Sequence, residues 1–246
     1  SPRTFDRELF GKHALWVQSA PSFKPNPEFY RDSTYGPRSV KPLTEQHGDV
    51  IDRFIEACRQ AGLKIYFQLG AVQPTGLRDE DRPKQVDGEV GNIRMADTGS
   101  LASPAIRQYN RAYVNDILAR YPDVDGFRID WPEYPCYTMY ETLHDFSPHV
   151  QTWAEQHEFD EGGLAIDELF AGMVRFHRQI AGGLTDRLLG ETRGMSIAPA
   201  FAHLAGDDGA AVNGWLRLKT ALSVDLVADW RRLLDEIRDD LHLTAH

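Results

Sequence analysis

Residues 125–134, with the sequence DGFRIDWPEY, decide the fold that we expect for this chain. Residues 126–130 within them predict a short strand, because side chains alternate between the two faces of a strand. This alternation separates two apolar side chains from the charged pair Arg128 and Asp130. Such a strand needs a packed layer on its apolar face and a polar cavity on the other. We therefore expect Asp130 at the rim of a pocket, with Arg128 one layer deeper.

Strands and helices alternate along the rest of the chain, which favours a parallel sheet with helical crossovers. The hydrophobic patterns predict further strands at residues 13–20, 63–69 and 195–201. Helices are expected at residues 49–61, 104–121, 165–189, 210–221 and 223–241. The last of these helices leaves one alternative open, a short strand at residues 224–227.

This order of elements predicts an α/β fold of the (β/α)8 TIM-barrel type, in which catalytic residues lie at the C-terminal ends of the strands. A closed barrel needs eight strands, whereas the sequence offers four or five. We therefore expect a barrel that is incomplete or part of a longer one, forming a single domain over residues 1–246.

Composition limits the classes of partner. The chain has 246 residues, of which 41% are hydrophobic, and a formal charge of −10. This negative charge argues against nucleic acid or an anionic membrane as the partner. No apolar run approaches the roughly 18 residues of a membrane span. Two cysteines, Cys58 and Cys136, make no disulfide framework. The compartment, either the cytoplasm or outside the cell after removal of a signal, and the oligomeric state stay open.

The segment GFRID at residues 126–130 resembles the strand-four signature Gly-Phe-Arg-x-Asp of the α-amylase clan of barrel glycoside hydrolases. The resemblance implies that Asp130 is the nucleophile and that Arg128 orients it. Residues 125–133 also resemble the strand-four motif of chitinase-type barrels, but Arg128 replaces an Asp of that motif. Pro132 stands where its acidic Glu belongs, and Glu133 comes one place late. The resemblance therefore implies a glycosidase and a carbohydrate substrate, without naming a family.

Glycoside hydrolysis needs one ionised and one protonated carboxyl group. Asp130 should be ionised because Arg128 lies nearby, and it could serve as nucleophile or as base for a water. Glu133 lies between aromatic residues and could remain protonated as the acid. Because Glu133 is only three residues from Asp130, other carboxylates stay open as the acid. They are Glu191, Asp207, Asp225 and Asp229.

Aromatic and amide side chains near expected strand ends are the candidates for binding a sugar. Residues 131–160 show no clean helical or strand period, and long loops of this kind are usually functional or disordered. The aromatic content of residues 131–160 argues against disorder. Two loop residues after residue 69, Arg94 and Asp97, could also reach over the rim. The substrate-binding candidates are Trp16, Gln18, Tyr66, Gln68, Trp131, Tyr134, Tyr137 and His203.

Two further functions stay open. A barrel that binds carbohydrate without cleaving it would use the same aromatic segment. A metal-dependent hydrolase would use Asp130 with His144, Asp145 and His149, but no His-x-His or His-Glu-x-x-His pattern is present. We therefore expect neither a metal nor another cofactor.

Overall fold

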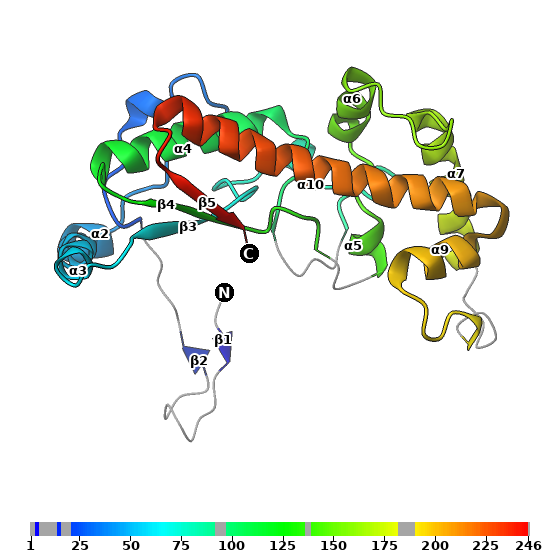
Figure 1. Cartoon of the computed structure of the whole chain (residues 1–246), viewed down its shortest axis with the longest axis horizontal. Helices are drawn as coiled ribbons and strands as arrows, with labels where there is room; N and C mark the ends of the chain where they lie inside the picture. The colour runs from blue at the N-terminus through cyan, green and yellow to red at the C-terminus, as the bar shows by residue number, and fades with distance from the viewer. Residues whose placement is uncertain are drawn as a thin grey trace.

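Figure 1 shows the computed structural model of the chain, which describes residues 3–4, 14–15, 21–91, 97–135, 139–181 and 190–245. Its centre is a parallel sheet of order β3-β4-β5. The strands are β3 (Tyr66–Gly70), β4 (Gly126–Asp130) and β5 (His242–Ala245). A separate antiparallel ladder joins β1 (Arg3–Thr4) to β2 (Ala14–Leu15).

The remaining elements are helical. In chain order they are η1 (Pro27–Tyr30), α2 (Pro42–His47), α3 (Asp49–Gln60), η2 (Asp79–Asp81), α4 (Pro104–Arg120), α5 (Met139–Leu143), α6 (Pro148–Gln156), α7 (Ile166–Ala181), α9 (Ile197–Ala205), η3 (Gly206–Asp208) and α10 (Gly209–Ile237). Each of α2, α4 and α6 has a proline in its first turn, where a missing N–H leaves no hydrogen bond unmade.

The two faces of the sheet differ. Phe127 and Ile129 of β4 are fully buried and pair in register with Phe67 and Leu69 of β3, so these side chains share the apolar face. In Figure 1, α4 and the C-terminal half of α10 lie along one side of the sheet. Strands β4 and β5 approach closely at Gly126, where a Cβ atom would lie 2.2 Å from the carbonyl oxygen of His242. Gly126 therefore lets these two strands pair.

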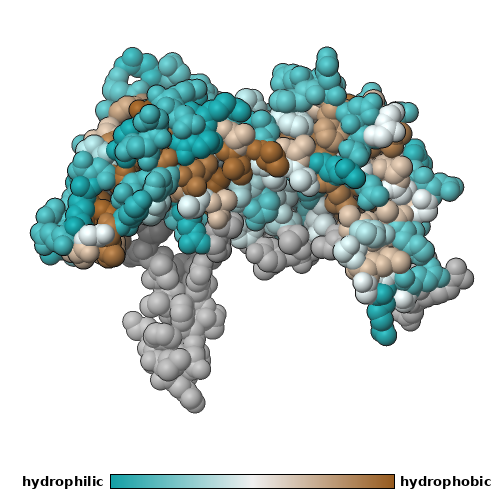
Figure 2. All heavy atoms as spheres, in the orientation of Figure 1, coloured by the Kyte–Doolittle hydropathy of each residue, from teal (hydrophilic) through white to brown (hydrophobic). Residues whose placement is uncertain are grey.

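Helix α10 joins the two halves of the molecule. Its 29 residues span about 43 Å at 1.5 Å per residue. The N-terminal half packs on α7 and α9, and the C-terminal half crosses the sheet (Figure 1). Buried Leu218, Leu222 and Leu226 form a continuous apolar stripe. Figure 2 shows hydrophilic residues over most of this face of the molecule, with hydrophobic ones between them where α10 crosses the sheet.

The expected TIM barrel is wrong, because the parallel sheet formed by the described residues has three strands. Residues 195–201 were expected as a strand, but the chain forms α9 there. Short apolar runs do not distinguish a strand from a buried helix. Pro199 falls in the first turn of α9, where it costs no helical hydrogen bond. Of the expected strand 13–20, Ala14 and Leu15 pair with β1, and the rest lies outside the described residues.

The structure contains helices at most of the positions where the sequence predicts them. Helices α3 and α4 confirm the expected helices at residues 49–61 and 104–121, apart from the ends. Helix α7 confirms residues 166–181 of the helix expected at 165–189, and residues 182–189 lie outside the described residues. Residues 210–221 and 223–237 belong to one helix, α10, rather than two, and this helix ends at Ile237 instead of the expected residue 241. The alternative strand at 224–227 is wrong. No glycine or proline lies between these two segments, so nothing ends the helix there. No helix among the described residues is long and apolar enough to cross a membrane.

Candidate functional site

The second face of the sheet is polar and open to solvent, which is unusual for a parallel sheet. Tyr66 is 38% exposed, and its hydroxyl lies 2.7 Å from Nδ1 of His242 on β5. Gln68 is exposed, and Asp130 is partly buried. The alternation of the strands and their register place six polar side chains on this face: Tyr66, Gln68, Arg128, Asp130, His242 and Thr244.

Asp130 ends β4 at the C-terminal edge of the sheet. Its Oδ2 atom accepts a 3.2 Å hydrogen bond from Nε2 of Gln68, on the neighbouring strand. Its carbonyl oxygen accepts a 2.8 Å hydrogen bond from the N–H of Ala71, which continues the ladder one residue beyond β3. The carboxylate is thus positioned by β3 as well as by its own strand.

Arg128 does not hold Asp130 as expected. It lies on the same face and is partly buried, but no ion pair joins these two residues within the described part of the chain. Gln68 is the residue of β3 that contacts the carboxylate. The sheet alternation was predictable from the sequence, whereas this cross-strand contact depends on the register between β3 and β4.

Trp131 follows Asp130 in a left-handed backbone conformation, with φ of 60°. A residue with a Cβ atom adopts this conformation at a cost of about 1–2 kcal/mol. Such outliers concentrate at functional sites, where the surrounding structure maintains them. The Trp131 side chain is partly buried, whereas Glu133 is exposed at a bend two residues later.

Tyr134 anchors this turn to the core rather than presenting an open ring. It is only 5% exposed, and its hydroxyl donates a 3.0 Å hydrogen bond to Oδ2 of Asp145. The hydroxyl also accepts a hydrogen bond from the N–H of Leu101. Burial, and then the charge of Asp145, raises the pKa of Tyr134 well above its ordinary value. Tyr134 therefore remains a neutral hydroxyl that fixes the position of Glu133.

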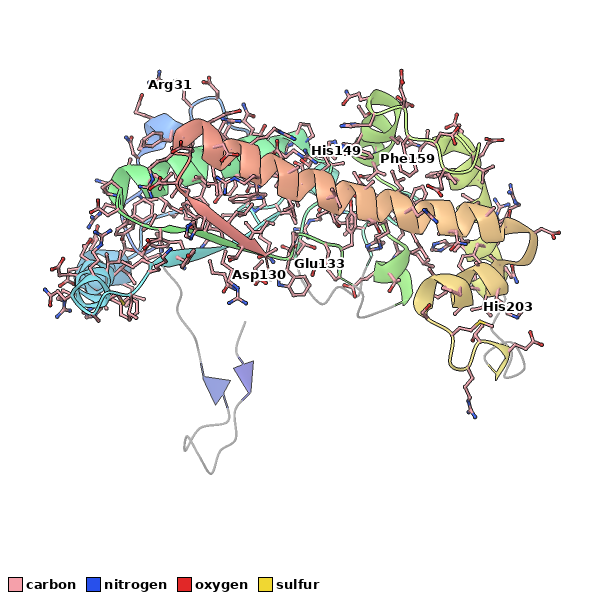
Figure 3. The ribbon with its side chains drawn as sticks, viewed as in Figure 1. Arg31, Asp130, Glu133, His149, Phe159 and His203 are labelled. Atoms are coloured by element: carbon pink, nitrogen blue, oxygen red, sulfur yellow. The ribbon has the colours of Figure 1, made fainter. Side chains whose placement is uncertain are left out.

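A cleft of about 280 Å³ lies beside Glu133, between the segment after β4, α9 and α10. Figure 3 shows Asp130 and Glu133 close together, near the C-terminal end of β5. The residues that line the cleft are Glu133, Tyr134, Thr142, Ala198, Leu216, Lys219, Thr220 and Ser223. The sequence reasoning missed those on α10, because nothing in the sequence relates a helix at residue 220 to a strand ending at residue 130.

The other candidate acids lie elsewhere or have structural partners. Glu191 lies 3.3 Å from His203, which Figure 3 shows at the far end of the molecule from Asp130. Asp207 belongs to η3, which adjoins α9 at that end. Asp225 accepts a 2.8 Å hydrogen bond from Trp153 and pairs with Arg107 at 2.8 Å.

Asp229, on α10, pairs with Arg232 at 3.1 Å. In the loop after β3, Asp97 forms an ion pair with Arg82. Glu133 follows Asp130 by three residues and lies close to it (Figure 3).

The proposed metal ligands do not converge. Asp145 accepts hydrogen bonds from the backbone N–H groups of Lys84 and Ser147, at 2.9 and 2.8 Å. His149 lies 3.2 Å from Asp81, away from the sheet end. Across the described ranges, no group of three or more His, Cys, Asp or Glu side chains could hold a metal ion.

Four candidate site residues lie outside the described residues: Trp16, Gln18, Arg94 and Tyr137. Comparison of the chain with protein-family models and with curated proteins gave no match.

Proposed function

We propose that the protein is a glycoside hydrolase whose Asp130 and Glu133 act on a glycosidic bond at the C-terminal edge of β3 and β4. The observation that carries the proposal is the placement of Asp130, which Gln68 contacts across the open polar face. The strained Trp131 and the cleft-lining Glu133 follow within three residues. A pair of Asp and Glu carboxyl groups is what this reaction needs.

In the proposed reaction, protonated Glu133 donates its proton to the glycosidic oxygen as the bond to the anomeric carbon breaks. Asp130 either attacks that carbon or removes a proton from the water that attacks it. In both cases water supplies the new hydroxyl on the sugar. The other proton of this water replaces the one that Glu133 donated, so that the pair of carboxyl groups again shares one proton. Three residues of chain span at most about 11 Å, which is compatible with the carboxyl separations of retaining and of inverting enzymes.

A test starts with hydrolysis of a panel of aryl glycosides and oligosaccharides, followed by the same assays on Asp130→Asn. We expect turnover to fall by about 10²–10⁴-fold, the usual contribution of a positioned acid or base. Asp123→Asn is the matched control, since its side chain is 72% exposed at the opposite end of β4. Undiminished turnover by Asp130→Asn, or no cleavage of any substrate by the unaltered protein, would contradict the proposal.

A second candidate is carbohydrate binding without cleavage. The absence of an ion pair between Arg128 and Asp130 in the described structure favours it, because the resemblance assigns Arg128 the role of orienting the nucleophile. Under this alternative, sugars bind to both the unaltered protein and Asp130→Asn, and no product forms. Analysis of the products by mass spectrometry therefore separates the two functions.

A further inference from the structure

The cleft beside Glu133 combines an apolar floor with a hydrogen-bonding rim. Ala198, Leu216 and the side of Tyr134 supply the apolar part. The rim carries one carboxylate, one ammonium group and three hydroxyl groups, from Glu133, Lys219, Thr142, Thr220 and Ser223. A small-molecule site typically has this composition, a mostly apolar wall with a few placed polar groups.

The polar groups on α10 are held in defined positions. The hydroxyl of Thr220 donates a 3.1 Å hydrogen bond to the carbonyl oxygen of Leu216, one turn earlier. The hydroxyl of Ser223 does the same to Lys219 at 3.2 Å. Each hydroxyl oxygen has two lone pairs, so both can accept a hydrogen bond from a ligand.

Lys219 is positioned by the segment on the opposite side of the cleft. Its Nζ atom donates a 3.3 Å hydrogen bond to the carbonyl oxygen of Glu141 and another to that of Thr142. It also lies 5.1 Å from the centre of the Tyr134 ring. The ammonium group therefore joins α10 to the segment after β4 and keeps a cation at the wall of the cleft.

We infer that this cleft binds one sugar ring of the substrate, next to the ring that is cleaved, so that the substrate is at least a disaccharide. A sugar ring has C–H faces for an apolar floor and hydroxyl groups that both donate and accept hydrogen bonds at its edge. The volume of about 280 Å³ lies just below the range of about 300–1,000 Å³ that is typical of ligand sites, and it suits a single ring. Glu133 lines the cleft three residues after Asp130, so a ring bound in the cleft would bring the bond to its neighbour near this carboxyl group.

This inference rests on the proposed function. Its test distinguishes failure of the sugar site from failure of the proposed hydrolysis. Asp130→Asn is applied to a glycan array, and the best-bound oligosaccharide and its terminal monosaccharide are then titrated. Adding Thr220→Trp fills the cleft from the exposed surface of α10. The matched control is Val224→Trp, because Val224 is 64% exposed one turn later and does not line the cleft. Thermal unfolding of both variants checks the fold.

We expect Thr220→Trp to weaken oligosaccharide binding about tenfold or more, equivalent to 1.4 kcal/mol, and to leave monosaccharide binding unchanged. Val224→Trp should change neither. Equal oligosaccharide affinity in the two variants would overturn the inference, even if Asp130→Asn abolishes hydrolysis. Conversely, cleft-dependent binding without cleavage by the unaltered protein would support the sugar site and reject hydrolysis. Failure of every sugar on the array to bind would overturn both.

Discussion

The side-chain amide of Gln68 donates a 3.2 Å hydrogen bond to the carboxylate of Asp130, across the register that pairs β3 with β4. Gln68 pairs in register with Arg128. The contact therefore runs diagonally to Asp130, the next residue of β4 on the same face of the sheet. It places a neutral amide donor against the proposed nucleophile.

Replacing Gln68 with alanine should lower turnover about tenfold and leave the free energy of unfolding nearly unchanged. Turnover should fall because Asp130 loses the donor that positions it. The free energy of unfolding should change little because this hydrogen bond is exposed and water can replace the donor. Kinetics on the substrate found for the unaltered protein and urea denaturation measure the two quantities. Gln60→Ala is the matched control, since Gln60 donates a 2.8 Å hydrogen bond to Glu56 on the exposed face of α3. Equal turnover in both variants would show that Gln68 does not position Asp130.

The left-handed backbone of Trp131 allows strain to be separated from contact. Both Trp131→Gly and Trp131→Ala remove the ring, but only glycine relieves the backbone. We expect the glycine variant to be more stable than the alanine variant by about 1–2 kcal/mol, while sugar binding falls in both. The control is the same pair of substitutions at Thr220, in the middle of α10. There the alanine variant should be more stable than the glycine variant, because glycine weakens a helix. If Trp131→Ala is as stable as Trp131→Gly or more stable, the left-handed backbone at residue 131 carries no strain.

Asp81 is a fully buried carboxylate with several donors. It accepts hydrogen bonds from the hydroxyls of Tyr35 and Ser103, at 2.6 and 2.5 Å, and from Arg78. Burial alone would raise its pKa, but the hydrogen bonds from Ser103, Tyr35 and Arg78 outweigh burial and lower the pKa of Asp81 below 3.8. The resulting stability is present above pH 3.8 and is lost as the pH falls through the lowered value.

Asp81→Asn should therefore lower the free energy of unfolding at pH 7 by about 3 kcal/mol, since it leaves buried donors poorly matched. The difference from the unaltered protein should shrink in acid, where both forms are uncharged. Asp79→Asn is the control, because its side chain is 88% exposed in the same short helix. A change at pH 7 no larger than that of the control would exclude a role of this network in stability.

His177 should make the protein sensitive to mild acid. It is 8% exposed, and its Nε2 atom has no hydrogen-bond partner among the described residues. Burial lowers the pKa of His177 below 6.5, although the charge of Asp87 opposes the shift. The unfolded chain then binds a proton near pH 6.5 that the folded chain does not, so stability falls as the pH drops below 6.5.

His177→Leu should reduce this loss, which reaches at most about 1.4 kcal/mol per pH unit. Urea denaturation at pH 8 and pH 5.5 measures the loss, with His47→Gln at an exposed site as the control. Identical losses in His177→Leu and the unaltered protein would assign the acid sensitivity to other groups.

Local patterns predicted the elements that depend on local physics. The alternation in residues 126–130 and the apolar spacing of residues 104–121 were sufficient for β4 and α4. The apolar run at residues 195–201 was not, because a buried helix and a buried strand can have the same composition. The strand expected at residues 195–201 was part of the reason to expect a barrel, and the three-stranded parallel sheet rules the barrel out.

By itself, the sequence determined that Arg128 and Asp130 share one face of a strand and that Asp130 ends it, because the geometry of a strand fixes side-chain alternation. Only the tertiary structure decided that Gln68 contacts Asp130 and that Glu133 meets Lys219 and Thr220 at one cleft. Those relationships depend on the register between strands and on the path of a helix 90 residues away along the chain. Packing of the whole core sets both, and no local pattern encodes them.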